Sequence, residues 1–124
     1  MTHISVVDTL DRLIVAIDNS VRDLRDGLED AVSTTAREGN DIAKGLARKT
    51  AGAHGRRYPS SFYAARLGHA DYIYGPTSAR AQGGMSFEFG SRNQPPHLDL
   101  AKSADIIGTR LAMRVRAVLE DASL

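Results

Sequence analysis

Apolar side chains recur at alternating spacings of three and four residues near the start of the chain. The series is Val7, Leu10, Ile14, Ile17, Val21, Leu24 and Leu28. This spacing places the side chains on one face of an α-helix, while aspartate and arginine occupy the other faces. We therefore predict a helix from about residue 5 to residue 38, with Ser5 and Asp8 in a capping arrangement at its start.

The apolar series weakens after Leu28 and resumes at Ile42 and Leu46. Gly39 and Asn40 lie between the two parts, and a glycine inside a helical pattern favours a break or a kink. We expect a second helical piece at 41–50. The long helix, with or without that kink, takes up residues 1–51.

The predicted length of this helix has a consequence for assembly. The first piece alone would be about 50 Å long, whereas a compact chain of 124 residues is roughly 35–40 Å across. Part of the helix should therefore project beyond its own domain, and an apolar face left in water is unfavourable. We expect another subunit to cover it; the alternative is a bend at Gly27 or Gly39 that folds the helix back. The candidate subunit contacts are Val7, Leu10, Ile14, Ile17, Val21 and Leu24.

The centre of the chain has the character of a small sheet. After a glycine-rich basic linker at 52–60, short stretches at 61–67, 70–74 and 85–89 are typical of strands. Residues 67–69 are short enough for a hairpin turn, and 75–84 should be an exposed, mobile loop. These features predict an antiparallel sheet of three or four short strands over 61–90.

A second amphipathic helix closes the chain at 97–122. Its apolar positions are Leu100, Ala104, Ile107, Leu111, Val115 and Val118. Pro96 stands at or just before its first turn, where proline is favoured. The predicted fold is a single α+β domain over residues 1–124, in which a long N-terminal helix is followed by the sheet and by a C-terminal helix packed on the sheet.

The residues that carry catalysis or bind metals are few. The chain has no cysteine, its four histidines show no metal-ligand spacing, and the usual phosphate-binding and nucleophile motifs are missing. We expect no enzyme activity, catalytic residue, cofactor or metal. A small enzyme built on His69, Asp71 and Glu88 remains an alternative, although Glu88, on an alternating strand, should face solvent or a neighbour's arginine. The apolar runs are too short to span a membrane.

Charge is distributed unevenly along the chain. Residues 1–41 carry nine acids and four arginines, whereas residues 42–92 carry eight bases and two acids. Opposite charges at separate ends suit association between copies. Within 42–69 six bases occur without an acid, so a nucleic-acid-binding accessory protein without sequence specificity is a second hypothesis. These bases are Lys44, Arg48, Lys49, Arg56, Arg57 and Arg66.

One short segment carries a family resemblance. Phe87-Glu88-Phe89-Gly90-Ser91 is followed by Pro95-Pro96-His97-Leu98 and then by the closing helix. Over about residues 40–110 this order resembles the neck and tail-completion proteins of long-tailed bacteriophages, the HK-type gene-product-ten-like family. Ser91 stands where that family usually has Thr, and His97-Leu98 where Pro-Phe-Leu is common. Tyr58-Pro-Ser-Ser-Phe replaces the family's Pro-Val-x-Thr-Gly-x-Leu segment.

The resemblance implies a structural virion protein. Such proteins form homo-oligomeric rings, here expected to be six-fold or twelve-fold, at the head–tail junction, and they join the head connector to the tail tube around the genomic DNA. The chain would be assembled in the host cytoplasm and would have no membrane partner. The motif turn that would position the closing helix is Phe87, Glu88, Phe89, Gly90 and Pro96. The candidates to face the lumen, the DNA or an adjoining ring are Arg56, Arg57 and Arg80.

Overall fold

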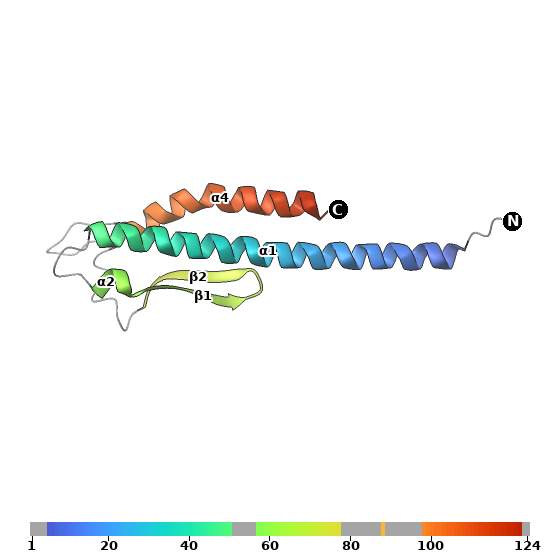
Figure 1. Cartoon of the computed structure of the whole chain (residues 1–124), viewed down its shortest axis with the longest axis horizontal. Coiled ribbons are helices and arrows are strands. Elements are labelled where there is room, and N and C mark those ends of the chain that lie inside the picture. The colour runs from blue at the N-terminus through green and yellow to red at the C-terminus, as the bar shows by residue number, and fades with distance from the viewer. Residues whose placement is uncertain (1–4, 51–56, 78–87, 89–97, 123–124) are drawn as a thin grey trace.

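The computed structural model describes residues 5–50, 57–77, 88 and 98–122. Its elements are helix α1 (Val6–Thr50), the short helix α2 (Arg57–Ser60), strands β1 (Phe62–Gly68) and β2 (Asp71–Pro76), and helix α4 (Asp99–Asp121). Figure 1 shows α1 as the central axis, with α4 along one side and the β1–β2 hairpin along the other. The fold is therefore α+β, as the sequence predicts.

Helix α1 is continuous over 45 residues, about 68 Å at the usual rise. The predicted kink at Gly39–Asn40 is wrong, and the helix does not bend at Gly27 either (Figure 1). Both glycines are packing positions. A Cβ atom at Gly39 would lie 2.7 Å from Cζ of Tyr74, and one at Gly27 would lie 2.7 Å from Cγ1 of Val118. The glycines let the neighbouring elements approach the backbone of α1.

The sheet has two antiparallel strands among the described residues, not three or four. Phe62 pairs with Pro76 and Arg66 with Tyr72, close to the strands predicted at 61–67 and 70–74. The third expected strand, at 85–89, lies outside the described residues except for Glu88, and the strand prediction is wrong at that residue because its backbone is helical. Part of the predicted linker, at 57–60, is the helical turn α2.

The core is small and lies at the C-terminal end of α1. Ala43 and Ala47 of α1 pack with Tyr58 of α2 and Phe62 of β1, and Tyr74 and Leu100 contact this cluster. The rings of Tyr58 and Phe62 meet edge to face, with their centres 5.0 Å apart. Each helix and strand of the described residues thus contributes to one cluster, which holds the folded body at the C-terminal half of α1.

Helix α4 corresponds closely to the predicted closing helix and lies chiefly on α1. It meets the sheet at β2, where the hydroxyls of Tyr74 and Ser103 are 2.8 Å apart. Leu100 also lies against Gly75 of β2. The C-terminal helix therefore touches the sheet near its own start and runs antiparallel to α1 for the rest of its length (Figure 1).

Candidate assembly surface

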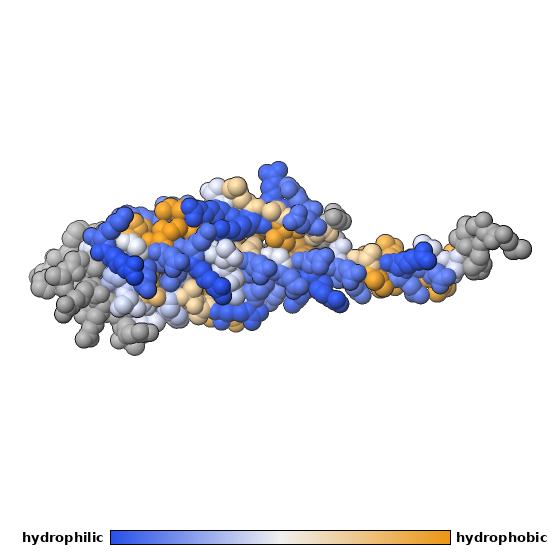
Figure 2. Space-filling model, in the orientation of Figure 1, coloured by the Kyte–Doolittle hydropathy of each residue, from blue (hydrophilic) through white to orange (hydrophobic). Residues whose placement is uncertain are grey.

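The N-terminal part of α1 projects beyond the folded body. All residues from 6 to 19 are exposed, and the first buried residue of the helix is Ala31. Apolar side chains lie on this projection: Val7 is 66% exposed, Ile14 56% and Ile17 49%. Figure 2 shows orange apolar patches at this end of the molecule, away from the body. The single chain leaves the predicted apolar face in water.

This face continues beneath α4. Ala31 and Thr35 follow Leu24 and Leu28 at the same three- and four-residue spacing, and both are buried. Thr35 accepts a hydrogen bond from Arg114 of α4. One continuous face of α1 thus packs against α4 in the body and is open to solvent in the projection.

The end of α4 marks where this cover stops. Ile107 of α4 lies against Gly39 and Val118 against Gly27. Helix α4 ends at Asp121, less than one turn beyond Val118, and so reaches the neighbourhood of Leu24. Within the described part of the chain, the side chains from Val7 to Val21 have no cover.

A charged clamp fixes α4 on α1. Arg114 donates hydrogen bonds from Nη1 to Oε2 of Glu38, at 2.8 Å, and from Nη2 to Oε1, at 2.6 Å. Nη1 of Arg110 lies 3.5 Å from the same carboxylate. The hydrogen bond from Arg114 lowers the pKa of Glu38 below its ordinary value. This clamp was not predicted from the sequence, although a glutamate at an apolar-face position was a signal of it.

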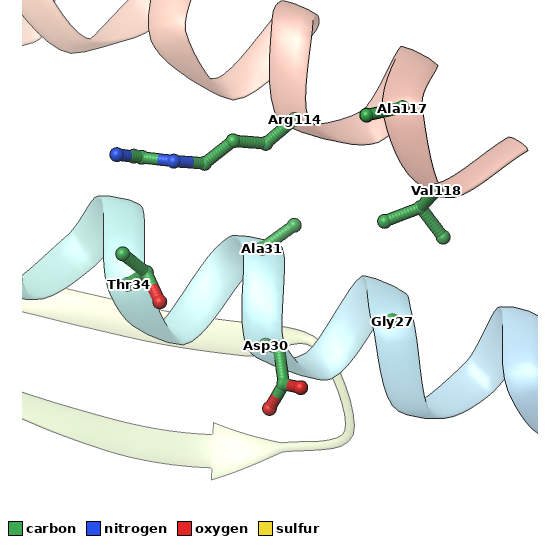
Figure 3. A pocket seen from close by; sticks show the side chains of 7 residues that line it. All are labelled: Gly27, Asp30, Ala31, Thr34, Arg114, Ala117 and Val118. Carbon is green, nitrogen blue, oxygen red and sulfur yellow. The ribbon is translucent and has the colours of Figure 1, made fainter. Parts of the chain in front are cut away.

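A groove beside the clamp is shallow and open. It measures about 320 Å³ and lies between α1 and α4 (Figure 3). The groove exists because the side chains that face each other there are small: Gly27 and Ala31 on α1, and Ala117 and Val118 on α4. Its walls hold no set of side chains arranged for a reaction.

Glu88 anchors the start of α4. Its carboxylate accepts hydrogen bonds from the backbone N–H groups of Leu100, at 2.7 Å, and Ala101, at 3.1 Å. Its carbonyl accepts one from the N–H of Leu98, at 3.0 Å. The expectation that Glu88 faces solvent or a neighbour is wrong, since the residue is 2% exposed. A carboxylate is favoured here because the first turn of a helix has unpaired N–H groups and a positive dipole end.

A second buried carboxylate lies at the same junction. Asp99 is fully buried and accepts a hydrogen bond from the hydroxyl of Thr50, the last residue of α1. Burial raises the pKa of Tyr58 well above its ordinary value, and the charges of Asp99 and Glu88 add to that shift. The junction ties the end of α1 to the start of α4 and to α2.

Most of the other predicted site residues lie outside the described part of the chain. In the motif turn, Phe87, Phe89, Gly90 and Pro96 lie outside the described residues, as do Arg56 and Arg80. Arg57 begins α2. Among the bases of 42–69, Arg66 forms an ion pair with Glu29, while Arg48 and Lys49 are exposed at the end of α1.

The alternative enzyme site is not assembled. His69 and Asp71 are exposed at the hairpin turn, whereas Glu88 lies at the start of α4. Gly75, four residues beyond Asp71, is the part of β2 that reaches this start of α4. Four residues of a strand span about 13 Å, so Asp71 lies about that far from the start of α4, where Glu88 is bound.

Two further absences concern only residues 5–50, 57–77, 88 and 98–122. In these ranges no three histidine, aspartate or glutamate side chains gather where a metal ion could be held. No helix there has the length and apolar character needed to cross a membrane. Comparisons with family models, curated proteins and solved structures gave no match.

Proposed function

We propose that this chain is a structural protein of a bacteriophage particle. Copies of it form a ring at the head–tail junction, around the DNA path, and join the head connector to the tail tube. The single observation that carries the proposal is the apolar face of α1, which projects from the body without cover. A helix of this kind is suited to bind protein, and the resemblance at residues 87–98 indicates which assembly it serves.

The energy of covering the projection supports an assembly role. Complete burial of a valine, leucine or isoleucine side chain contributes roughly 1.5–3 kcal/mol. The side chains of Leu10, Ile14 and Ile17 are each about half exposed, so each still has about half of that gain available. Covering these three side chains would contribute roughly 2–4 kcal/mol, which favours association.

The charges of the described residues support contacts between unlike surfaces. The projection from Ser5 to Asp26 carries five aspartates and three arginines. The opposite end of α1 presents Arg48 and Lys49 to solvent. Rings are built from contacts between different surfaces of successive copies, and opposite charges favour such contacts.

Nucleic-acid binding is the second candidate, and the exposure of Arg48 and Lys49 favours it. The pairing of Arg66 with Glu29 counts against it, because this removes one base from the stretch. A monomeric chain whose DNA binding falls steeply with added salt would support this alternative.

The test uses the phage or prophage that encodes the chain. A stop codon in the gene should yield DNA-filled heads and free tails in electron micrographs, and the intact gene supplied in trans should restore joined particles. The double variant Ile14→Gln/Ile17→Gln should fail to restore them. Arg22→Gln, an exposed change outside the apolar face, serves as the matched control. Normal infectious particles without the chain would overturn the proposal.

A further inference from the structure

We propose that the partner on the projecting face is a second copy of this chain. The projecting halves of two α1 helices lie side by side, point in the same direction and are in register, as a two-stranded coiled coil. This inference rests on the proposed function, because it names the partner that covers the same face. An even-numbered ring would then contain a whole number of such pairs.

The identity of the apolar residues favours a parallel pair of helices. Over three heptads one core position is filled by Val7, Ile14 and Val21, and the other by Leu10, Ile17 and Leu24. Branching at Cβ throughout the first position, combined with leucine at two of the three second positions, Leu10 and Leu24, favours two parallel strands. The structure shows that the face is free to pair, since Val7, Leu10, Ile14, Ile17 and Val21 are between 44% and 66% exposed.

The charges beside the core are also compatible with a parallel pair. In a parallel, in-register pair, the residue before each first core position faces the partner residue five positions later. Val6 then faces Asp11, Leu13 faces Asp18, and Ser20 faces Arg25. Like charges do not meet in any of these contacts.

The antiparallel alternative brings like charges together. The positions that follow the second core residues, Leu10, Ile17 and Leu24, then face one another, and two of them are Asp11 and Asp18. With Val7 opposite Leu24, Asp11 of each copy lies beside Asp18 of the other. With Val7 opposite Ile17, Asp11 lies beside its own equivalent. Facing carboxylates disfavour both arrangements.

The position of α4 limits how far two α1 helices can pair. This helix lies over Gly27, Ala31 and Thr35 and ends near Leu24. Pairing is therefore limited to the three heptads that α4 leaves open. In an antiparallel pair with the longest overlap, the first turn of one α1 would meet the end of the partner's α4 near Leu24. In the parallel pair, both first turns point away from both bodies, and the two α1 helices separate beyond Leu24, where α4 takes the place of the partner helix.

The test exploits the absence of cysteine from the sequence. Leu10→Cys and Ile17→Cys are made separately in the full chain and exposed to mild oxidant. In a parallel, in-register pair each new thiol faces its own equivalent at the distance that a disulfide requires, so each variant should cross-link to itself. Asn19→Cys, an exposed change outside the apolar face, is the matched control and should stay mostly uncross-linked.

Light scattering supplies the second readout. Before oxidation, the full chain should have twice its mass of 13.4 kDa at high concentration and dissociate on dilution. A pair formed from Leu10→Cys mixed with Val21→Cys, without self-linkage of either, would show antiparallel pairing and overturn the inference. A three-copy mass would overturn the two-stranded form. A monomer at every concentration, without self-linkage, would overturn self-pairing altogether.

These outcomes are separate from those for the proposed function. If the chain is monomeric but its loss still separates heads from tails, another virion protein covers the face and the inference alone fails. If the chain pairs in parallel but particles form normally without it, the virion role fails and the inference about pairing stands.

Discussion

Arg114 on α4 donates a hydrogen bond to each carboxylate oxygen of Glu38 on α1, with N–O distances of 2.8 and 2.6 Å. Such a two-pronged contact between a guanidinium and a carboxylate is directional as well as strong. The same guanidinium donates to the hydroxyl of Thr35, one turn away. The contact with Glu38 therefore fixes the position of α4 along α1 and also the rotation of α4 about the axis of α4.

This clamp predicts a loss of stability in acid. The pKa of Glu38 in the folded chain lies below its ordinary value of 4.5, chiefly because of the hydrogen bond from Arg114. A carboxyl with a lowered folded pKa stabilises the fold above its unfolded pKa, and that contribution is lost as pH falls through the folded pKa. We expect the urea concentration at half-unfolding to decrease as the pH is lowered below about 4.5. This decrease should be less steep in Glu38→Gln than in the parent chain.

Glu120→Gln is the control for that series. Glu120 pairs with Arg116 on the exposed side of α4, at 3.2 Å, and exposed pairs of this kind contribute little. Its urea midpoints should follow those of the parent chain at every pH. Equal slopes for Glu38→Gln and the parent chain would show that the clamp does not contribute to the acid response.

Gly39 and Gly45 provide a matched pair of glycine substitutions in α1. An alanine Cβ at Gly39 would lie 2.7 Å from Cζ of Tyr74 and 2.8 Å from Cδ1 of Ile107, whereas one at Gly45 meets no atom within 4 Å. We expect Gly39→Ala to lower the free energy of unfolding by about 1–3 kcal/mol through overpacking. Gly45→Ala should raise it by about 0.5–1 kcal/mol because alanine favours helix. Urea unfolding measures both, and equal effects at the two sites would contradict the packing role.

Removal of the Glu88 carboxylate should loosen the start of α4. In Glu88→Ala the N–H groups of Leu100 and Ala101 lose their acceptor, and loss of such a helix-capping oxygen costs about 0.5–2 kcal/mol. Glu88→Gln keeps one acceptor oxygen and should lose less. Hydrogen exchange at Leu100 and Ala101 should become faster in Glu88→Ala while exchange in α1 stays slow. Unchanged exchange at both amides would show that water replaces the carboxylate without loss.

The elements predicted correctly are those set by local spacing. The start of α1, the two strands of the hairpin and α4 all follow from periodicity within a few turns of chain. The kink at Gly39 was predicted from a local preference of about 1 kcal/mol, and the packing of Tyr74 and Ile107 on that glycine outweighs it. The sequence pattern cannot supply such distant contacts, because it contains no information on which faces meet.

The same limit applies to the functional surface. The exposed face from Val7 to Val21 was predicted because the helix exceeds the width of a compact domain, and the structure leaves these side chains exposed. The clamp between Glu38 and Arg114 joins residues 76 positions apart, and spacing along one helix does not show it. Glu88 was placed on an alternating strand, which gave the wrong direction for its side chain.

The projection should contribute to assembly and not to the stability of the body. Ile14 and Ile17 are about half exposed in the single chain, and they lie on the part of α1 that projects beyond the body. Substituting both with glutamine should therefore change the free energy of unfolding of the dilute chain by less than about 0.5 kcal/mol. The same variant should stay monomeric in light scattering at concentrations where the parent chain associates. A large loss of stability in the dilute variant would instead show that these side chains are buried against the chain's own body, so that the face is not available to a partner.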